Sequence, residues 1–342
     1  NYVEIKNNII KLKNHKIRFN IKATKKSLTG SGKIKIQENF DDLKYNIDLK
    51  DNDFKLNSQL ILSELKLNSQ KYLKNFITNL DSATTLKDQK IDISLDKKEF
   101  LIKGFGKIKF DTDFEDIKFK IIKIKDKFNF NTHLDLKKTS FKIDYLNFIK
   151  NDKLNTKIKF LGSYETGKSL IFENLSIIDE NNKLVLKNLY IDKNNLIKKV
   201  DRINLEFLDK QNKKNKILLK KVKKNRYKIT GSSFNADKLI ENLLMKKKDN
   251  GTKFFQEDFK LILNLEKVYL DNLNSINDLN GNLNIKNNEI YEANISGDFD
   301  DINNLKFTVN TNNVGEKITT LFSSRAKPLV KRYKFIKGFE DS

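Results

Sequence analysis

Few residues of this chain combine the types and the spacing that catalysis or metal binding requires. The 342 residues include two histidines, His15 and His133, and no Cys. Each histidine stands within a strand-like pattern without a flanking partner at the spacing of a metal or acid–base site. The absence of Cys excludes disulfides, thiolate ligands and cysteine nucleophiles. We therefore expect both histidines to be structural or surface residues, and we expect no enzyme activity, cofactor or metal site.

Residues 29–33 have the composition of a phosphate-binding loop without its spacing. Their sequence is TGSGK, but a Walker A loop needs a glycine where Ser27 stands and a Ser or Thr where Ile34 stands. We interpret this segment as a turn.

The acidic segment that begins at Asp111 resembles the start of a calcium-binding loop. Asp113 and Glu115 continue the spacing of the ligands, but Asp116 occupies the position of the required Gly and Ile122 that of the bidentate Glu. We therefore expect no calcium site here.

Residues 210–228 form a strongly basic segment, with nine Lys, one Arg and no acidic residue. Such a run can attract anionic lipid headgroups. Nucleic-acid binding would need interleaved aromatic residues, and Tyr227 is the only one in the run. We favour a solvated hairpin whose outward lysines protect a sheet edge.

Apolar and polar residues alternate along most of the chain, and this alternation predicts the elements that position every candidate residue. Because successive side chains of a strand point to opposite faces, each such segment is predicted to be a strand with one apolar and one polar face. Clusters of Asn, Asp and Lys, typical of hairpin turns, recur every 8 to 15 residues or so. We expect about 16 to 20 strands in an antiparallel meander. The clearest segments are residues 33–36, 45–49, 91–95, 117–121, 128–130, 141–145, 158–160, 203–207, 261–265 and 305–309.

Three short amphipathic helices are expected beside the strands. Residues 69–80 and 315–325 place apolar side chains at helical spacing, and Asn235 is a candidate N-cap for a helix over residues 236–244. We expect all three helices to pack against the core.

Composition and strand number together predict an elongated fold. The net charge is +23, and no run of 18 apolar residues predicts a membrane-spanning helix. A sandwich or a small barrel would hide the apolar faces, but the expected strands exceed what either uses. We predict a mainly β fold, a long antiparallel meander curled into a groove roughly 85 Å long at ~4.8 Å per strand. An empty groove of that size would expose too much apolar surface, so acyl chains are its natural filler.

Twelve apolar residues of these strands are expected to line the groove and to replace water around acyl chains, while the headgroups stay at its mouth. They are Phe119, Ile121, Phe128, Phe130, Phe141, Ile143, Ile158, Phe160, Leu205, Phe207, Leu263 and Phe307. Phase slips such as Ile121–Ile122 leave open which of the alternate residues face the groove.

The last third of the chain resembles a known family. Residues 230–240 (TGSSFNADKLI) are similar to the G-x-S-F-D-A-x-x-L-L segment of the AsmA-like superfamily, in its YhdP-like branch. The further segments that match in order and spacing are residues 259–268, 279–283, 295–297 and 309–315, followed by Leu321 and Gly338. The departures are Asn235 for an Asp, Asn312 and Asn313 for an Asp pair, and Lys337 for a Gly. Residues 1–229 match this family only in style.

The resemblance implies a bridge-like lipid transfer protein. AsmA-like proteins such as YhdP and TamB have an N-terminal inner-membrane anchor and cross the periplasm of Gram-negative bacteria as a β-groove that carries phospholipids to the outer membrane. Residues 1–229 would then be a repeat-like strand ladder that residues 230–342 continue, and the chain would be a piece of a longer protein without its anchor. The implied partners are phospholipid acyl chains, both membranes and membrane proteins at either end, and no nucleic acid.

A second hypothesis comes from a different functional class. Sheets closed into a dry β-sandwich would make the chain a structural or assembly scaffold, or a chaperone for outer-membrane proteins, acting through an exposed strand edge. The two hypotheses differ in whether the apolar faces contact lipid or protein.

Overall fold

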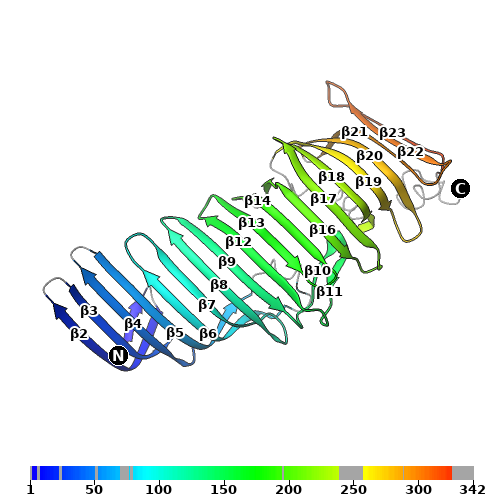
Figure 1. The fold of residues 1–342 in the computed structure, drawn as a ribbon. Coiled ribbons are helices and arrows are strands. Elements are labelled where there is room, and N and C mark those ends of the chain that lie inside the picture. Colours follow the sequence, from blue (N-terminus) through cyan, green and yellow to red (C-terminus); the bar gives the residue numbers. More distant parts are fainter. Residues whose placement is uncertain are drawn as a thin grey trace. The chain divides into compact units, whose positions relative to one another are not determined.

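A computed structural model describes residues 2–5, 8–22, 25–50, 53–69, 77, 80–194, 196–238, 257–287 and 289–325. In these residues the fold is mainly β, as predicted: 21 strands belong to one mainly antiparallel, meandering sheet, and two short strands form a separate pair (Figure 1). The chain divides into two compact units, residues 1–142 with 150–175 and residues 143–149 with 176–342. The predicted division at residues 229 and 230 falls inside a strand, β18. In the described residues no helix is long and apolar enough to cross a membrane.

Unit 1 is an antiparallel ladder in which β2 to β9 and then β12 are neighbours in order (Figure 1). Its strands are β1 (Tyr2–Ile5), β2 (Asn8–Lys22), β3 (Lys25–Lys35), β4 (Phe40–Lys50), β5 (Asp53–Asn68), β6 (Ala83–Leu95), β7 (Phe100–Lys109), β8 (Phe114–Ile124), β9 (Lys127–Leu136) and β12 (Thr156–Glu165). The boundary between the units falls within β13 (Ser169–Ile178) and within the short strand β10 (Phe141–Ile143).

Unit 2 continues the meander with one change of direction. Strands β16 to β18 are antiparallel, β18 pairs with β19 in parallel, and β19 to β23 are antiparallel again. The strands are β11 (Phe148–Lys150), β14 (Lys183–Asp192), β15 (Ile197–Lys199), β16 (Arg202–Leu208), β17 (Lys214–Lys223), β18 (Arg226–Asn235), β19 (Phe259–Tyr269), β20 (Ser275–Lys286), β21 (Glu289–Asp298), β22 (Asn304–Thr311) and β23 (Lys317–Ser323), with a 3₁₀ turn, η2 (Asp144–Leu146).

Bulges restore the apolar face at two places where the sequence alternation slips. The pairing register of β6 with β7 shifts between Lys87 and Lys90, and the register of β2 with β3 shifts between Lys13 and Lys16. Asp88 lies inside the first shift and has a φ of 50°. Because one extra residue reverses the side-chain alternation, Leu86 and Ile91 end on the same face although five positions separate them. Asp and Asn tolerate this left-handed conformation better than other residues with a side chain.

A recurring Asp-x-x-Asn turn closes three of the hairpins, at residues 179–182, 271–274 and 300–303. In each, the Asp carboxylate accepts hydrogen bonds from the backbone N–H and the side-chain amide of the Asn three residues later. Asn182 also accepts a bond from the backbone N–H of Leu208, 3.1 Å away, at the end of β16. These turns therefore satisfy backbone groups that leave the ladder at the strand ends.

Two sequence predictions of local structure are wrong. Residues 315–325 were expected to form a helix, but Lys317–Ser323 is strand β23, paired with β22 from Leu305 to Thr311. Pairing with the sheet edge overrides the helical spacing, and the β-branched Thr319 and Thr320 suit a strand. Residues 29–33, interpreted as a turn, lie inside β3.

The two other predicted helices fall mostly outside the described residues. These include only residues 69, 77 and 80 of the first helix. At the second, Asp237 and Lys238 are helical, and the N–H of Asp237 donates to Asn235 Oδ1 at 3.2 Å, the bond expected of an N-cap. The described part of the chain thus contains almost no helix.

Candidate functional site

One face of unit 1 is apolar across nine neighbouring strands. Residues directly opposite each other on neighbouring strands share a face, so the pairing registers define rows that cross the sheet. We call three such rows, on one side of β2 to β9 and β12, the apolar face of unit 1. They are Gly32, Leu43, Leu60, Ile91, Gly104, Phe119, Thr132 and Phe160; Ile17, Gly30, Tyr45, Ser58, Ile93, Ile102, Ile121, Phe130 and Gly162; and Phe19, Leu28, Ile47, Leu56, Leu95, Phe100, Lys123, Phe128 and Tyr164.

The structure brings six of the twelve predicted lining residues together on this face. Phe119, Ile121, Phe128, Phe130 and Phe160 belong to the three rows, and Ile158 lies on the same side in the next row, opposite Leu134. Ile158 is buried, and the other five are partly exposed. The sequence left open which of Ile121 and Ile122 belongs to the apolar side of the strand. In the structure Ile121 lies on the apolar face, and Ile122 lies opposite Leu101 on the other face.

Aromatic rings cluster on the apolar face at β9, β12 and β13. The ring of Phe172 lies 5.8 Å from that of Phe130, edge to face, and 6.3 Å from that of Phe160. The rings of Phe128 and Tyr164 are 6.4 Å apart. These separations are within the range of favourable aromatic pairs, so Phe130, Phe160 and Phe172 form one cluster, and Phe128 and Tyr164 form a second pair.

Glycines opposite aromatic residues allow the rings to lie down over the neighbouring strand. A Cβ atom on Gly104 would stand 2.7 Å from Cζ of Phe119, its cross-strand partner. Gly30 is covered in the same way by Tyr45. Aromatic cover of a strand glycine compensates for the missing side chain. This pairing was not predicted, although glycines inside alternating strands signal a close approach of this kind.

Unit 2 has an apolar face of the same construction. One apolar row crosses nine strands, β14 and β16 to β23, through Leu186, Ile203, Leu219, Ile229, Leu263, Gly281, Ile295, Phe307 and Leu321. The predicted residues Leu263 and Phe307 both belong to it. Leu205 and Phe207 lie on the same face of β16, where Phe207 is buried edge to face against Phe148, with ring centroids 5.5 Å apart.

Two of the predicted lining residues do not lie on either face. Phe141 and Ile143 belong to β10, which pairs with β11 in the separate two-stranded sheet. Phe141 is buried, and its backbone forms a bridge with Ile77. The alternation over residues 141–145 predicts a strand of the main sheet, and this prediction is wrong. The strand β10 ends after three residues, and the 3₁₀ turn η2 follows it.

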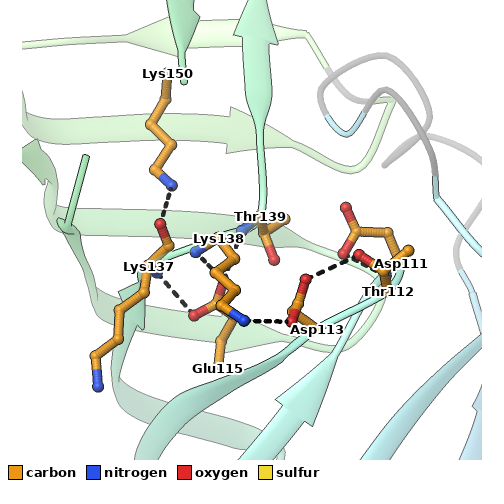
Figure 2. Close-up of polar contacts among 8 residues, drawn as sticks. All are labelled: Asp111, Thr112, Asp113, Glu115, Lys137, Lys138, Thr139 and Lys150. Atoms are coloured by element: carbon orange, nitrogen blue, oxygen red, sulfur yellow. Dashed lines mark hydrogen bonds and ion pairs between the residues drawn. The ribbon is translucent and has the colours of Figure 1, made fainter. Parts of the chain in front are cut away.

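Polar groups lie at one end of the apolar face of unit 1, at the start of β8 and the end of β9. Glu115, at the start of β8, is buried, and its carboxylate accepts the backbone N–H groups of Lys137, Lys138 and Thr139 at 2.7, 2.8 and 2.6 Å (Figure 2). Burial raises the pKa of this carboxyl, but the three donors outweigh burial, and the pKa is lowered overall. The carboxylate therefore fixes the end of β9 as a charged acceptor.

The acids of the calcium-like segment have structural partners in the same place. Asp113 pairs with the ammonium of Lys138 at 2.9 Å, and Thr112 donates its hydroxyl to Asp113 at 3.0 Å (Figure 2). Lys150 is buried and donates to the carbonyl oxygen of Lys137 at 3.1 Å. No group of three or more His, Asp or Glu positioned to hold a metal ion occurs among the described residues.

The opposite face of each unit is polar, and in each unit this polar face contains a hollow. In unit 1, Lys44, Gln59, Asp92 and Lys103 form part of one polar row and line a hollow of about 580 Å³. In unit 2, a hollow of about 540 Å³ is lined by residues that include Arg226, Lys228, Lys260 and four asparagines. Sequence analysis did not predict either hollow.

Both histidines lie within the sheet of unit 1. His15 Nε2 donates a hydrogen bond to the backbone carbonyl oxygen of Lys33 at 3.0 Å. His133 lies on the polar face, directly between Lys118 and Lys159. Burial and these two ammonium groups lower the pKa of His133.

The basic segment over residues 210–228 includes a hairpin, as predicted. The segment contains β17 and the first three residues of β18, and the two strands are joined at Asn225, whose φ is 52°. The expected protection of a sheet edge is wrong, because β17 also pairs with β16 and β18 also pairs with β19.

Comparison with known proteins finds no family model, no curated protein and no solved structure that matches this chain.

Proposed function

We propose that this protein is a non-enzymatic phospholipid carrier whose apolar faces hold acyl chains. The observation that carries the proposal is the separation of the two faces: the three apolar rows of unit 1 contain only Ser58, Thr132 and Lys123 as polar side chains without an aromatic ring. Partly exposed Phe and Ile side chains on such a face gain about 25 cal/mol for each Å² that a lipid removes from water.

The dimensions of the apolar face of unit 1 suit an acyl chain. Along β5 its rows extend from Leu60 to Leu56, four residues or about 14 Å at ~3.4 Å per residue. One leaflet of a bilayer core is about 15 Å thick, half of the ~30 Å hydrocarbon core. An acyl chain therefore fits along a strand, between the polar groups near Glu115 and the row that contains Lys123.

A groove is the arrangement that we propose for transport. Acyl chains would move from strand to strand along the apolar rows, where no buried polar group would hold them, and the headgroups would remain in water at the strand ends. On the AsmA-like resemblance of residues 230–342, we propose that this transport takes place in the periplasm, from the inner to the outer membrane, in a protein with an inner-membrane anchor. Membrane proteins at either end would be its partners.

Photo-crosslinking tests the proposal at neighbouring positions. A photoreactive residue replaces Phe119 in one variant and Lys118 in the other, since these two side chains lie on opposite faces of β8. We expect phosphate-labelled lipid adducts in cells at position 119 and none at 118. Protein adducts without lipid at 119, in a folded variant, would support the scaffold or chaperone hypothesis, and adducts at neither position would also overturn the carrier proposal.

A further inference from the structure

A row of four basic residues crosses the polar face of unit 2 without an intervening acid. Lys187, Arg202, Lys220 and Lys228 lie directly opposite one another on β14, β16, β17 and β18, which are neighbouring strands (Figure 1). All four side chains are exposed. With strands ~4.8 Å apart, four positive charges fall within about 15 Å.

A second basic row lies next to the first and extends onto β19. Lys223, Arg226 and Lys260 are opposite one another on β17, β18 and β19, and all three are exposed. Arg226 and Lys228 are two positions apart in β18 and share a face. We call these seven residues the basic ladder.

The basic ladder differs from the other polar rows of the sheet. Lysines face each other in other rows too, but there a carboxylate lies beside one member of the pair. Lys33 faces Lys13 and pairs with Asp42 at 2.9 Å. Lys103 faces Lys120 and lies 3.7 Å from Asp92. In the ladder, cation faces cation in five residue pairs across four pairs of neighbouring strands. Directly opposed like charges destabilise a sheet, so folding stability does not explain this arrangement. An anionic partner relieves the repulsion.

The hollow of about 540 Å³ adjoins the ladder. Arg226, Lys228 and Lys260 line it together with Asn264, Asn280, Asn282 and Asn284, and with one acid, Glu292, which accepts a hydrogen bond from Asn284 at 3.2 Å. Ammonium, guanidinium and amide groups are donors for phosphate oxygens. The hollow therefore provides room for a phosphate-bearing group at the edge of the basic rows.

We propose that the basic ladder binds the surface of an anionic phospholipid membrane through its phosphate groups. Two features favour a membrane over a nucleic acid. The ladder and the residues facing it on this side of the sheet include no aromatic residue for base stacking. Aliphatic side chains lie among them on the same face: Leu218 between Lys216 and Lys220, and Ile262 opposite Lys228. Basic residues mixed with aliphatic ones are typical of membrane-surface contacts.

The proposal does not depend on the acyl-chain surface, because the two surfaces lie on opposite faces of unit 2. Lys228 and Ile229, adjacent in β18, belong to the polar and the apolar face respectively. Substitutions can therefore remove one surface and leave the other intact.

The test measures co-sedimentation of the full chain with phosphatidylcholine vesicles that contain or lack phosphatidylglycerol. The ladder variant carries R202Q, K220Q and K228Q. The control variant carries K44Q, K90Q and K120Q, three exposed polar-face lysines of unit 1, and loses the same net charge. Each basic residue near an anionic surface contributes roughly fivefold in affinity, so the ladder variant should bind phosphatidylglycerol vesicles on the order of 100-fold more weakly than wild type.

The expected pattern is specific. The control variant binds phosphatidylglycerol vesicles as wild type does, and none of the proteins binds vesicles without phosphatidylglycerol. The ladder variant melts at the same temperature as wild type or higher, because repulsion between its basic side chains has been removed. Equal weakening in the ladder and control variants would show attraction by net charge alone and overturn the proposal. So would ladder-dependent binding of duplex DNA with unchanged vesicle binding, which would make nucleic acid the partner.

Discussion

Phe160→Glu tests the acyl-chain surface most directly. Phe160 lies in the apolar row between Thr132 and the β13 side of the sheet, with its ring 6.3 Å from that of Phe172. An acyl chain that passes over position 160 would cover the new carboxylate. Removing a carboxylate from water costs several kcal/mol even after the surroundings relax. Because Phe160 is only partly buried, we take the lower end of that range, about 3 kcal/mol.

That free energy sets the expected size of the effect. If it adds to the barrier for passage, transfer slows on the order of 100-fold, since 1.36 kcal/mol corresponds to tenfold in rate. The assay is transfer of labelled phospholipid between donor and acceptor vesicles, with thermal unfolding measured on the same samples. Phe160→Leu keeps the position apolar and should retain most of the transfer.

The matched control is Lys159→Glu, which places the same carboxylate one residue away on the polar face, opposite His133. It should transfer lipid at the wild-type rate. Our reasoning is refuted if folded Phe160→Glu transfers lipid as fast as wild type, or if Lys159→Glu slows transfer equally, because the face of the sheet would then not matter.

Two further predictions concern the construction of the apolar face of unit 1. Gly104→Val places a side chain where the Phe119 ring lies, 2.7 Å from a Cβ at this position, and should lower the free energy of unfolding by about 1–3 kcal/mol, measured with urea; an unchanged stability would mean that the ring does not rest on the glycine. Glu115→Gln replaces an acceptor of three backbone N–H groups and should cost about 1–3 kcal/mol at neutral pH. Because the folded-state pKa of Glu115 is lowered from 4.5, its contribution is complete above that value and is lost as the pH falls through the folded-state pKa. The difference between wild type and Glu115→Gln should therefore shrink in acid, and a difference that persists there would contradict a role for the charge.

The alternation predicted the faces more reliably than it predicted the elements. Ten of the twelve expected lining residues lie on an apolar face, because pleating alone assigns alternate residues to opposite sides. Phe141 and Ile143 do not, since their strand ends after three residues and pairs outside the main sheet. The failed helix over residues 315–325 has a related cause: a free sheet edge offers backbone partners that a local pattern does not reveal.

The sequence by itself determined that the protein is a β meander with one apolar and one polar side, because a period of two has no other structural reading over so many segments. Tertiary structure decided the register, and register decides the chemistry of each surface. Only strand pairing places Lys187, Arg202, Lys220 and Lys228, which span 42 positions of the chain, in one row. Only bulges at residues such as Asp88 keep Leu86 and Ile91 on one face. Both depend on hydrogen bonds between distant segments, and a linear sequence does not display those bonds.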